Sequence, residues 1–222
     1  MAQYYTAQLF DYLDRLRHNN NREWFNAHKD EYQELRMLWV GDVQRMINAM
    51  AGWEPELAGL RADRAVYRIY RDTRFSPDKT PYKDYFSALV TPYGRHLNRA
   101  SYYLHMGGED TGLHAGLWCP DSDMLKKLRH AIVDNIDEFQ EILDDPQFAA
   151  NWHGWWGEKL KTAPKGWPKD HPNIDLLRLK QYGRSHVVGE EFFLDPDWPE
   201  RAAVLFRTAR SLVDFLNYSI DE

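Results

Sequence analysis

The two ends of the chain carry apolar residues at the spacing of amphipathic helices. This pattern predicts a first helix over residues 6–18, with Thr6 as its cap, and a longer second helix whose apolar stripe covers residues 24–50. Asn20 and Glu23 stand three residues apart before that stripe, as in a capping box, and predict where the second helix begins. We therefore expect the N-terminal part of the chain to supply two helices that pack their apolar sides against other elements.

The C-terminal part repeats the helical pattern and adds one strand. Helical spacing over residues 121–144 follows the capping residue Asp121, and Pro146 is typical of the start of a further short helix. Asp197 marks the start of a final amphipathic helix. Between these helices, residues 176–182 carry Arg178 and Lys180 at alternating positions, which predicts one further strand of the sheet that continues through Val188.

The middle of the chain alternates apolar and polar residues with the period of β-strands. Four strands are expected there: Val66–Arg71, Tyr85–Thr91, Ser101–Met106 and Leu113–Trp118. Short connections with glycine favour an antiparallel arrangement. The sequence therefore predicts a single α+β domain over residues 1–222, an antiparallel sheet of about four to six strands packed with N-terminal and C-terminal helices. Its parts are helices in 6–51, the sheet in 66–119, and a helical region with one further strand in 121–220.

Alternation also predicts which side chains share a face of the sheet. In the last of the four strands, Leu113, Ala115 and Leu117 point one way and His114 points the other. If the apolar faces of all strands align, the second face gathers these side chains: Arg68, Tyr70, Tyr103, His105, His114 and Trp118. A shift of one residue would reverse a strand's contribution to this candidate pocket.

A basic segment stands out within an acidic chain. The net charge of the chain is −6, whereas residues 64–83 hold six basic residues against two acidic ones. Such a segment is typical of a place that receives an anion. We expect an anion to be held by Arg68, Arg71, Arg74, Lys79 and Lys83, with Tyr82 as a hydrogen-bond donor. The alternative is a structural network in which neighbouring aspartates pair with these bases.

A histidine and a tyrosine on the expected pocket face are candidates for proton transfer. His105 can carry a proton near neutral pH, and Tyr103 can donate a hydrogen bond to a ligand. The alternative is that His105 is an ordinary hydrogen-bonded residue of the sheet. His105 and His114 lack recognised metal-ligand spacing with Glu109 or Asp110, so no metal site is expected, and the sequence indicates no particular cofactor.

Residues 151–172 are rich in tryptophan and lysine. Interleaved aromatic and basic residues can stack on a nucleotide or sugar and hold its charge. The same tryptophans, Trp152, Trp155 and Trp156, can instead form a small hydrophobic cluster beneath a loop, with the lysines as a solvated surface. The sequence leaves both interpretations open.

Several functional classes lack their signatures. Cys119 is the single cysteine, which rules out an intramolecular disulfide framework and a CxxC motif. The chain has no GxxxxGKS/T loop, no GxSxG elbow and no HExxH. The absence of a recognised nucleophile points away from covalent catalysis and leaves acid–base chemistry open. No apolar run approaches the ~20 residues that cross a bilayer, and the N-terminus does not resemble a secretory signal. We therefore expect a cytoplasmic protein without a membrane partner, and its acidity argues against a broad nucleic-acid-binding surface.

Long motifs of unusual composition link the chain to a known family. They are NNNREWFNAHKDEYQ (residues 19–33), RIYRDTRFSPDKTPYK (68–83), YYLHM (102–106), APKGWPKDHP (163–172) and LLRLKQY (176–182). Through these motifs, nearly the whole chain resembles the domain of unknown function 2461 family. The resemblance implies a shared fold and brings no established activity, substrate or cofactor, so functional expectations rest on the chemistry of the residues.

The leading expectation is binding of a phosphate- or carboxylate-bearing small molecule in a basic pocket, to which acid–base catalysis by His105 can be added. The alternative is a non-catalytic module that recognises an acidic protein or a nucleic-acid end through the loop 71–83. A third interpretation makes the basic block purely structural. The sequence does not decide whether the protein is an enzyme.

Overall fold

The computed structural model describes residues 4–95 and 98–222, and its centre is one antiparallel sheet. Its five strands stand in the order β1-β2-β3-β5-β4, and each strand runs antiparallel to its neighbours. Their bounds are Phe86–Val90 (β1), Ser101–Met106 (β2), Gly112–Leu117 (β3), His153–Trp155 (β4) and Tyr182–Val187 (β5). Together with the surrounding helices, this sheet confirms the predicted α+β fold.

The prediction of a first strand over Val66–Arg71 is wrong. This segment forms only isolated bridges, at Val66 and Tyr70, and not a continuous ladder of hydrogen bonds to the sheet. Backbone hydrogen bonds between its two halves instead fold residues 69–83 into a narrow loop, which we call the arm. Two prolines lie within the arm, and because proline has no backbone N–H to donate, they favour a turn over continued pairing in a sheet.

The strand predicted over residues 176–188 is confirmed only from Tyr182 onward, where it forms β5. The residues before it begin with the short helix α8 (Ile174–Leu177). Strand β4 was not predicted, because three residues are too few to display an alternating pattern.

The N-terminal helices are α1 (Tyr5–His18), α2 (Arg22–Ala27) and α3 (Lys29–Met50), so the long second helix of the prediction is divided at His28. The side chain of Asn21, and not that of Asn20, accepts the capping hydrogen bond at the start of α2. Asn20 instead exchanges two hydrogen bonds with the backbone of Tyr82, at 2.9 and 3.1 Å. This pair of bonds ties the helical layer to the arm.

The C-terminal helices also subdivide the predicted ones. The 121–144 helix becomes α5 (Ser122–Asp134) and α6 (Ile136–Asp144), and it is capped by Asp121 as expected. The helix expected at Pro146 is α7 (Pro146–Asn151), and the last predicted helix becomes α9 (Trp198–Arg207) and α10 (Arg210–Asp221). Two smaller helical turns and α4 complete the set within the described residues, at Pro55–Leu57, Glu190–Phe192 and Ala62–Ala65.

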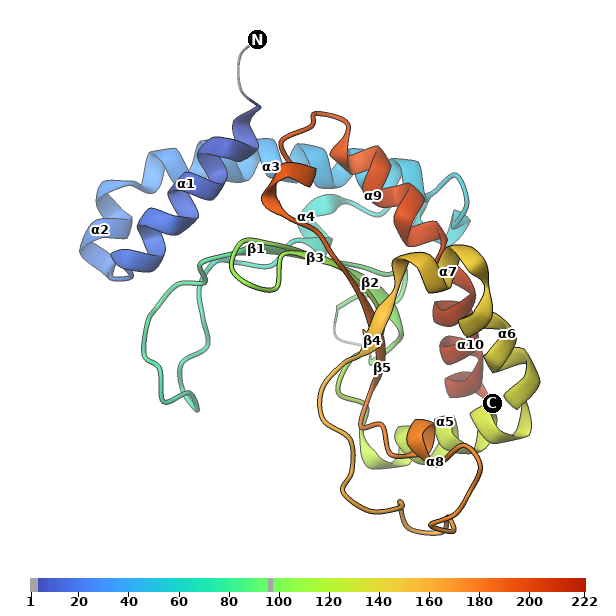
Figure 1. Cartoon of the computed structure of the whole chain (residues 1–222). Helices are drawn as coiled ribbons and strands as arrows, with labels where there is room; N and C mark the ends of the chain where they lie inside the picture. Colours follow the sequence, from blue (N-terminus) through green and yellow to red (C-terminus); the bar gives the residue numbers. More distant parts are fainter. Residues whose placement is uncertain (1–3, 96–97) are drawn as a thin grey trace.

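Helices cover one face of the sheet and leave the other to loops. In Figure 1, α1, α3 and α9 run across the top of the sheet, and α10, α6 and α5 follow its right-hand side. Leu104, Leu113, Ala115 and Leu117 point into this helical layer and are fully buried, as the predicted apolar face requires. Because these side chains remove large apolar areas from water, this layer is the main source of the stability of the fold.

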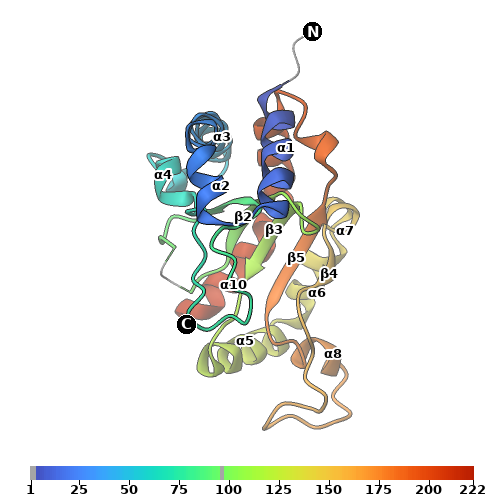
Figure 2. The ribbon, with the colours of Figure 1, turned by 90° about the vertical axis from the view of Figure 1, so that its left-hand side faces the viewer.

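Figure 2 looks toward the opposite side of the sheet, with the arm on one side and residues 157–173 on the other. We call residues 157–173 the lysine loop. Within residues 4–95 and 98–222, no helix is both long and apolar enough to span a membrane.

Candidate functional site

A cavity of about 750 Å³ lies against the face of the sheet that the helices leave open. Its lining combines side chains from β1, β2, β3 and β5 with the ends of the arm and of the lysine loop. The described lining residues are Tyr67, Lys83, Tyr85, Ser87, Leu89, Arg95, Asn98, Arg99, Ser101, Tyr103, His105, Asp110, His114, Gly116, Trp118, Cys119, Trp156, Gly157 and Ser185.

Strand register explains why the polar side chains meet. Tyr103 in β2 stands opposite His114 in β3, and His114 stands opposite Ser185 in β5, so these three side chains form one row across the sheet. The structure thus brings together Tyr103, His105, His114 and Trp118 of the predicted face. Arg68 and Tyr70 do not line the cavity, because the segment before the arm is not a regular strand, and Tyr67 takes their place.

His114 is held in one tautomer by its neighbours. Its Nε2 lies 3.3 Å from the backbone carbonyl of Asp110, which can only accept, so Nε2 carries the proton. Nδ1 then accepts from the Ser185 hydroxyl at 2.9 Å, and that hydroxyl accepts from Nε1–H of Trp156 at 2.6 Å. Burial lowers the pKa of His114, which favours this neutral form. The chain of bonds makes this wall of the cavity rigid.

His105 is the more deeply buried histidine, with 9% of its surface exposed. Its ring stacks on Tyr85 with centroids 4.1 Å apart, and its Nδ1 lies 3.3 Å from the hydroxyl of Tyr103. Burial, with a smaller effect from the nearby His114, lowers the pKa of His105 to about 4. Burial also raises the pKa of Tyr103, so its hydroxyl stays protonated and can donate a hydrogen bond to Nδ1 of His105. Near neutral pH both side chains are uncharged, with His105 as the base and Tyr103 as the hydrogen-bond donor.

Lys83 supplies a positive charge at the cavity wall. Its Nζ lies 4.9 Å from the ring centroid of Tyr67 and 5.6 Å from that of Tyr85. Asp84, the next residue in the sequence, does not neutralise it, because that carboxylate accepts from Arg17 at 2.8 Å. Burial first, and then Arg68 and Arg95, lower the pKa of Lys83.

Arg95 supplies a second positive charge against the same aromatic ring. Its guanidinium carbon lies 5.2 Å from the centroid of Tyr67, and its Nη1 donates to the carbonyl of Val66 at 2.7 Å. In the described part of the chain, neither Lys83 nor Arg95 forms an ion pair with a carboxylate. Arg99, a third basic residue of the lining, is already paired with Asp221.

The other predicted ligand-binding residues lie in the arm, outside the described lining of the cavity. Arg71 pairs with Asp78, and Arg74 pairs with Asp72 at 2.7 Å. Lys79 donates to the carbonyl of Thr73 at 2.8 Å. This is the local pairing that the structural interpretation of the basic segment describes.

Two predicted residues flank the arm's charged part. Tyr82 is buried, with its ring stacked on Phe25 at 4.0 Å between centroids. Arg68 is exposed and is close enough to Lys83 to lower the pKa of that ammonium. Neither lines the cavity, whereas Lys83, Tyr103 and His105 do.

Sequence reasoning missed several lining residues, chiefly Tyr67, Tyr85, Arg95 and Ser185. They come from four separate segments without a shared motif, so only tertiary structure brings them together. Trp156 could have been found from the sequence, because it lies in the tryptophan-rich segment for which stacking on a ligand was one of the two interpretations.

The rim of the cavity contains a strained backbone position. Cys119 has φ of 47°, in the left-handed region that residues other than glycine rarely adopt. Its N–H donates to the buried Gln181 side chain at 3.2 Å, and its carbonyl accepts from Asn98 at 3.2 Å. These bonds hold the turn that places the neighbouring Trp118 at the rim.

The donor set suits organic anions better than metal ions. In the residues that the structure describes, no group of three or more His, Cys, Asp or Glu side chains is arranged to hold a metal ion. The cavity lining instead combines the cations Lys83 and Arg95, the carboxylate of Asp110, the imidazoles of His105 and His114, the hydroxyl of Tyr103 and an aromatic wall. Such groups can bind an anion and move a proton on it.

Comparison with known proteins identifies a family and no better-understood relative. No curated protein and no solved structure matches the chain. A family model described as "Conserved hypothetical protein (DUF2461)" matches residues 8–215 of the 222 residues, and the motifs quoted above lie within that range. The chain therefore belongs to this family of conserved hypothetical proteins.

Proposed function

We propose that the cavity binds a small molecule that carries a phosphate or carboxylate group, with Lys83 and Arg95 as the groups that hold the anion. The observation that supports this most directly is the Lys83 ammonium, which is half-buried between two tyrosine rings without a carboxylate partner among the described residues. Burying an unpaired charge is costly, and a bound anion would offset that cost.

The surroundings of the two cations favour an organic anion over a bare inorganic one. A cavity of about 750 Å³ exceeds what a single phosphate fills, and tyrosine, histidine and tryptophan rings make up much of its wall. Small-molecule sites commonly combine such apolar walls with a few placed polar groups.

We also propose that His105 acts as a general base on the bound molecule, with Tyr103 as its hydrogen-bond donor. The low pKa of His105 keeps the imidazole free to accept a proton near neutral pH. The proton would pass from a carbon or oxygen of the ligand to the Tyr103 oxygen as the Tyr103 proton moves to Nδ1 of His105, because Nε2 already carries the proton of the neutral ring. Burial of His105 keeps bulk water from competing for that proton.

The test is calorimetric binding of ribose 5-phosphate and succinate to the wild type, Lys83→Met and Lys79→Met. Lys79 is the matched control, because it is a lysine bonded within the arm and outside the described lining. We expect at least one probe to bind, and Lys83→Met to weaken it by about 10- to 100-fold, as for loss of a charge-assisted hydrogen bond. Lys79→Met should bind as the wild type does.

Two results would contradict the proposal. One is that neither probe binds to the wild type. The other is that Lys83→Met, with unchanged circular dichroism and melting temperature, retains the full affinity.

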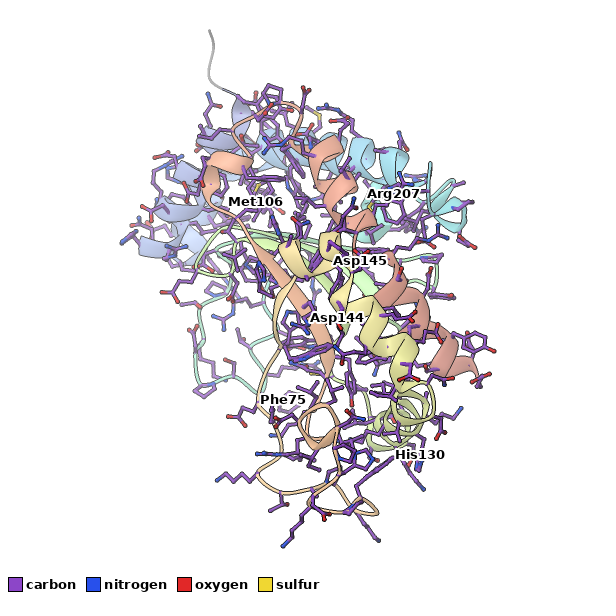
Figure 3. The ribbon with its side chains drawn as sticks, turned by 45° about the vertical axis from the view of Figure 1, so that its right-hand side comes forward. Phe75, Met106, His130, Asp144, Asp145 and Arg207 are labelled. Carbon is purple, nitrogen blue, oxygen red and sulfur yellow. The ribbon has the colours of Figure 1, made fainter. Side chains whose placement is uncertain are left out.

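A second candidate function is docking of an acidic protein partner by the arm. The observation that favours it is Phe75 (labelled in Figure 3), which is 92% exposed on the arm. The guanidinium carbon of Arg74 lies 5.6 Å from the centroid of the Phe75 ring. An exposed aromatic residue beside a cation is typical of interface anchors. Capture of a partner that is lost in Phe75→Ser but retained in Lys83→Met would support this candidate, and equal capture by both variants would contradict it.

A further inference from the structure

An unbroken row of aromatic rings crosses the cavity from its cations to its rim. Ring centroids lie 6.3 Å apart from Tyr67 to Tyr103, 5.7 Å from Tyr103 to His114, and 5.6 Å from His114 to Trp156. Trp118 continues the row, 5.6 Å from Trp156. Lys83 and Arg95 both lie against Tyr67, at the first end of the row, and the two tryptophans form the other end.

At the tryptophan end of the row, the ring of Trp156 is held in place by its neighbours. A Cβ atom at Gly183 would lie 2.1 Å from the ring of Trp156, so the ring rests directly on a strand position that only glycine leaves open. The indole N–H is fixed by the hydroxyl of Ser185 at 2.6 Å. Trp156 is therefore held by both packing and hydrogen bonding.

Trp118 adds a solvent-exposed ring next to this fixed one. It is 63% exposed, although it is a large aromatic side chain at the rim of a cavity. The strained turn at Cys119 directly follows it and is held by Gln181 and Asn98. Backbone strain of this kind is found preferentially at functional sites. A flat ligand would cover the exposed ring and gain stacking energy from it.

The two ends of the row are further apart than a single ring can bridge. Three centroid steps of 5.6 to 6.3 Å join Tyr67 to Trp156, so a ligand that contacts both the cations and the tryptophans must be elongated, as a nucleotide is. Between the two ends, the carboxylate of Asp110 lines the cavity near His105 and His114, and it can accept hydrogen bonds from the hydroxyl groups of a sugar. This order of features, from cations through polar groups to stacked rings, matches a phosphate, a sugar and a base.

We propose that the ligand is a nucleoside monophosphate, whose base stacks at Trp118 and Trp156 and whose phosphate lies between Lys83 and Arg95. The proposal rests on the anion-binding function proposed above and names its ligand class. A free nucleotide is favoured over a nucleic-acid strand, because the chain as a whole has a net charge of −6 and would repel an extended polyanion.

The experiment compares calorimetric affinities for adenosine 5′-monophosphate, ribose 5-phosphate and adenosine. The variants are Trp118→Ala and Tyr218→Ala, the latter a matched control, because Tyr218 is 67% exposed on α10 and outside the described lining. We expect adenosine 5′-monophosphate to bind at least about tenfold more tightly than ribose 5-phosphate, since base stacking on an aromatic ring contributes on that scale. Trp118→Ala should abolish this difference, and Tyr218→Ala should keep it.

The outcomes separate this inference from the function on which it rests. Equal affinity for the nucleotide and ribose 5-phosphate, with both lost in Lys83→Met, would overturn the nucleotide and retain the anion site. No binding of any phosphate compound to the wild type would overturn both. Tighter binding of a 5′-phosphorylated single-stranded oligonucleotide than of the mononucleotide would overturn the assignment of a free nucleotide.

Discussion

The basic residues in the outer part of the arm differ from those of the cavity, which include Lys83 at the end of the arm, in what neutralises them. In the arm, Arg71 and Arg74 pair with aspartates a few residues away, and Lys79 is bonded to a backbone carbonyl. In the cavity, Lys83 and Arg95 lie against the ring of Tyr67 without a carboxylate partner in the described structure. The number of basic residues in a segment is thus a poor measure of the charge that is available to a ligand.

The basic residues of the arm and of the cavity also differ in their exposure to solvent. Ion pairs on the surface of the arm are screened by water and salt, so they contribute little to stability and also leave little free charge. The cavity cations stand against low-dielectric aromatic walls, where an incoming anion is attracted more strongly. Each of the following predictions tests this difference between arm and cavity.

The largest expected effect is a pH dependence of stability that belongs to the cavity. Burial lowers the pKa of His105 from 6.5 to about 4, so the unfolded chain takes up a proton at a higher pH than the folded protein does. Stability should therefore fall as the pH drops below about 6.5 and level off near 4, by about 3 kcal/mol from this group. Urea denaturation at several pH values would measure it.

His105→Gln should remove most of that fall while leaving the contributions of other groups. The arm contains no histidine, so the difference between the two pH profiles can be assigned to the cavity. Parallel profiles for wild type and variant would contradict the burial argument.

The next effect concerns the rigid wall of the cavity. Gly183→Ala would press a methyl group into the ring of Trp156, and overpacking of this kind costs about 2 kcal/mol of unfolding free energy. Gly41→Ala is the control, because nothing lies within 4 Å of its added Cβ in helix α3, and alanine should stabilise that helix by up to ~1 kcal/mol. Changes of the same sign in both variants would argue against a tightly packed wall.

A smaller effect is the difference in ligand affinity that we expect between variants of two arginines. Arg95→Met should weaken binding of ribose 5-phosphate by about tenfold, or ~1.4 kcal/mol, because an unpaired cation beside the ligand is lost. Arg74→Met should change the affinity less than twofold, since Arg74 is paired with Asp72 outside the described lining. Calorimetry measures both, and equal losses would erase the distinction between arm and cavity.

The smallest effect is expected at the arm itself. Phe75→Ser removes a side chain that is 92% exposed, so the unfolding free energy should change by less than about 0.5 kcal/mol. Affinity for ribose 5-phosphate should stay the same. A clear loss of stability in thermal or urea unfolding would mean that the arm packs more firmly than its exposure indicates.

Local pattern was sufficient for most of the fold. Strands β2 and β3, their apolar face and the cap at Asp121 follow from alternation and from capping chemistry, which act over a few residues. The breaks at His28 and Asn135 interrupt apolar stripes that continue on both sides, so periodicity alone could not locate them. The prediction of a strand over Val66–Arg71 failed because the two ends of this segment pair with different partners, Val66 with Ala88 of β1 and Tyr70 with Tyr82 within the arm.

The sequence predicted some side chains of the candidate site and missed others. Tyr103 and His105 share a face because residues two apart in a strand point the same way, and His114 joins them because it stands opposite Tyr103 on β3. Arg95 and Ser185 join them only because the chain returns to the sheet after separate excursions. No local pattern encodes that return, since it depends on which apolar surfaces pack together.

The sequence by itself determined the α+β class, the faces of the central strands, the acidic net charge and the membership of the family. The tertiary structure alone decided which charges stay unpaired. Ion pairing in the arm is satisfied by neighbours in sequence, whereas Asp84, the neighbour of Lys83 in sequence, pairs with Arg17 of the distant helix α1. Whether a cation is available to a ligand therefore depends on the distances that folding sets, because an opposite charge must come within a few ångströms to neutralise it.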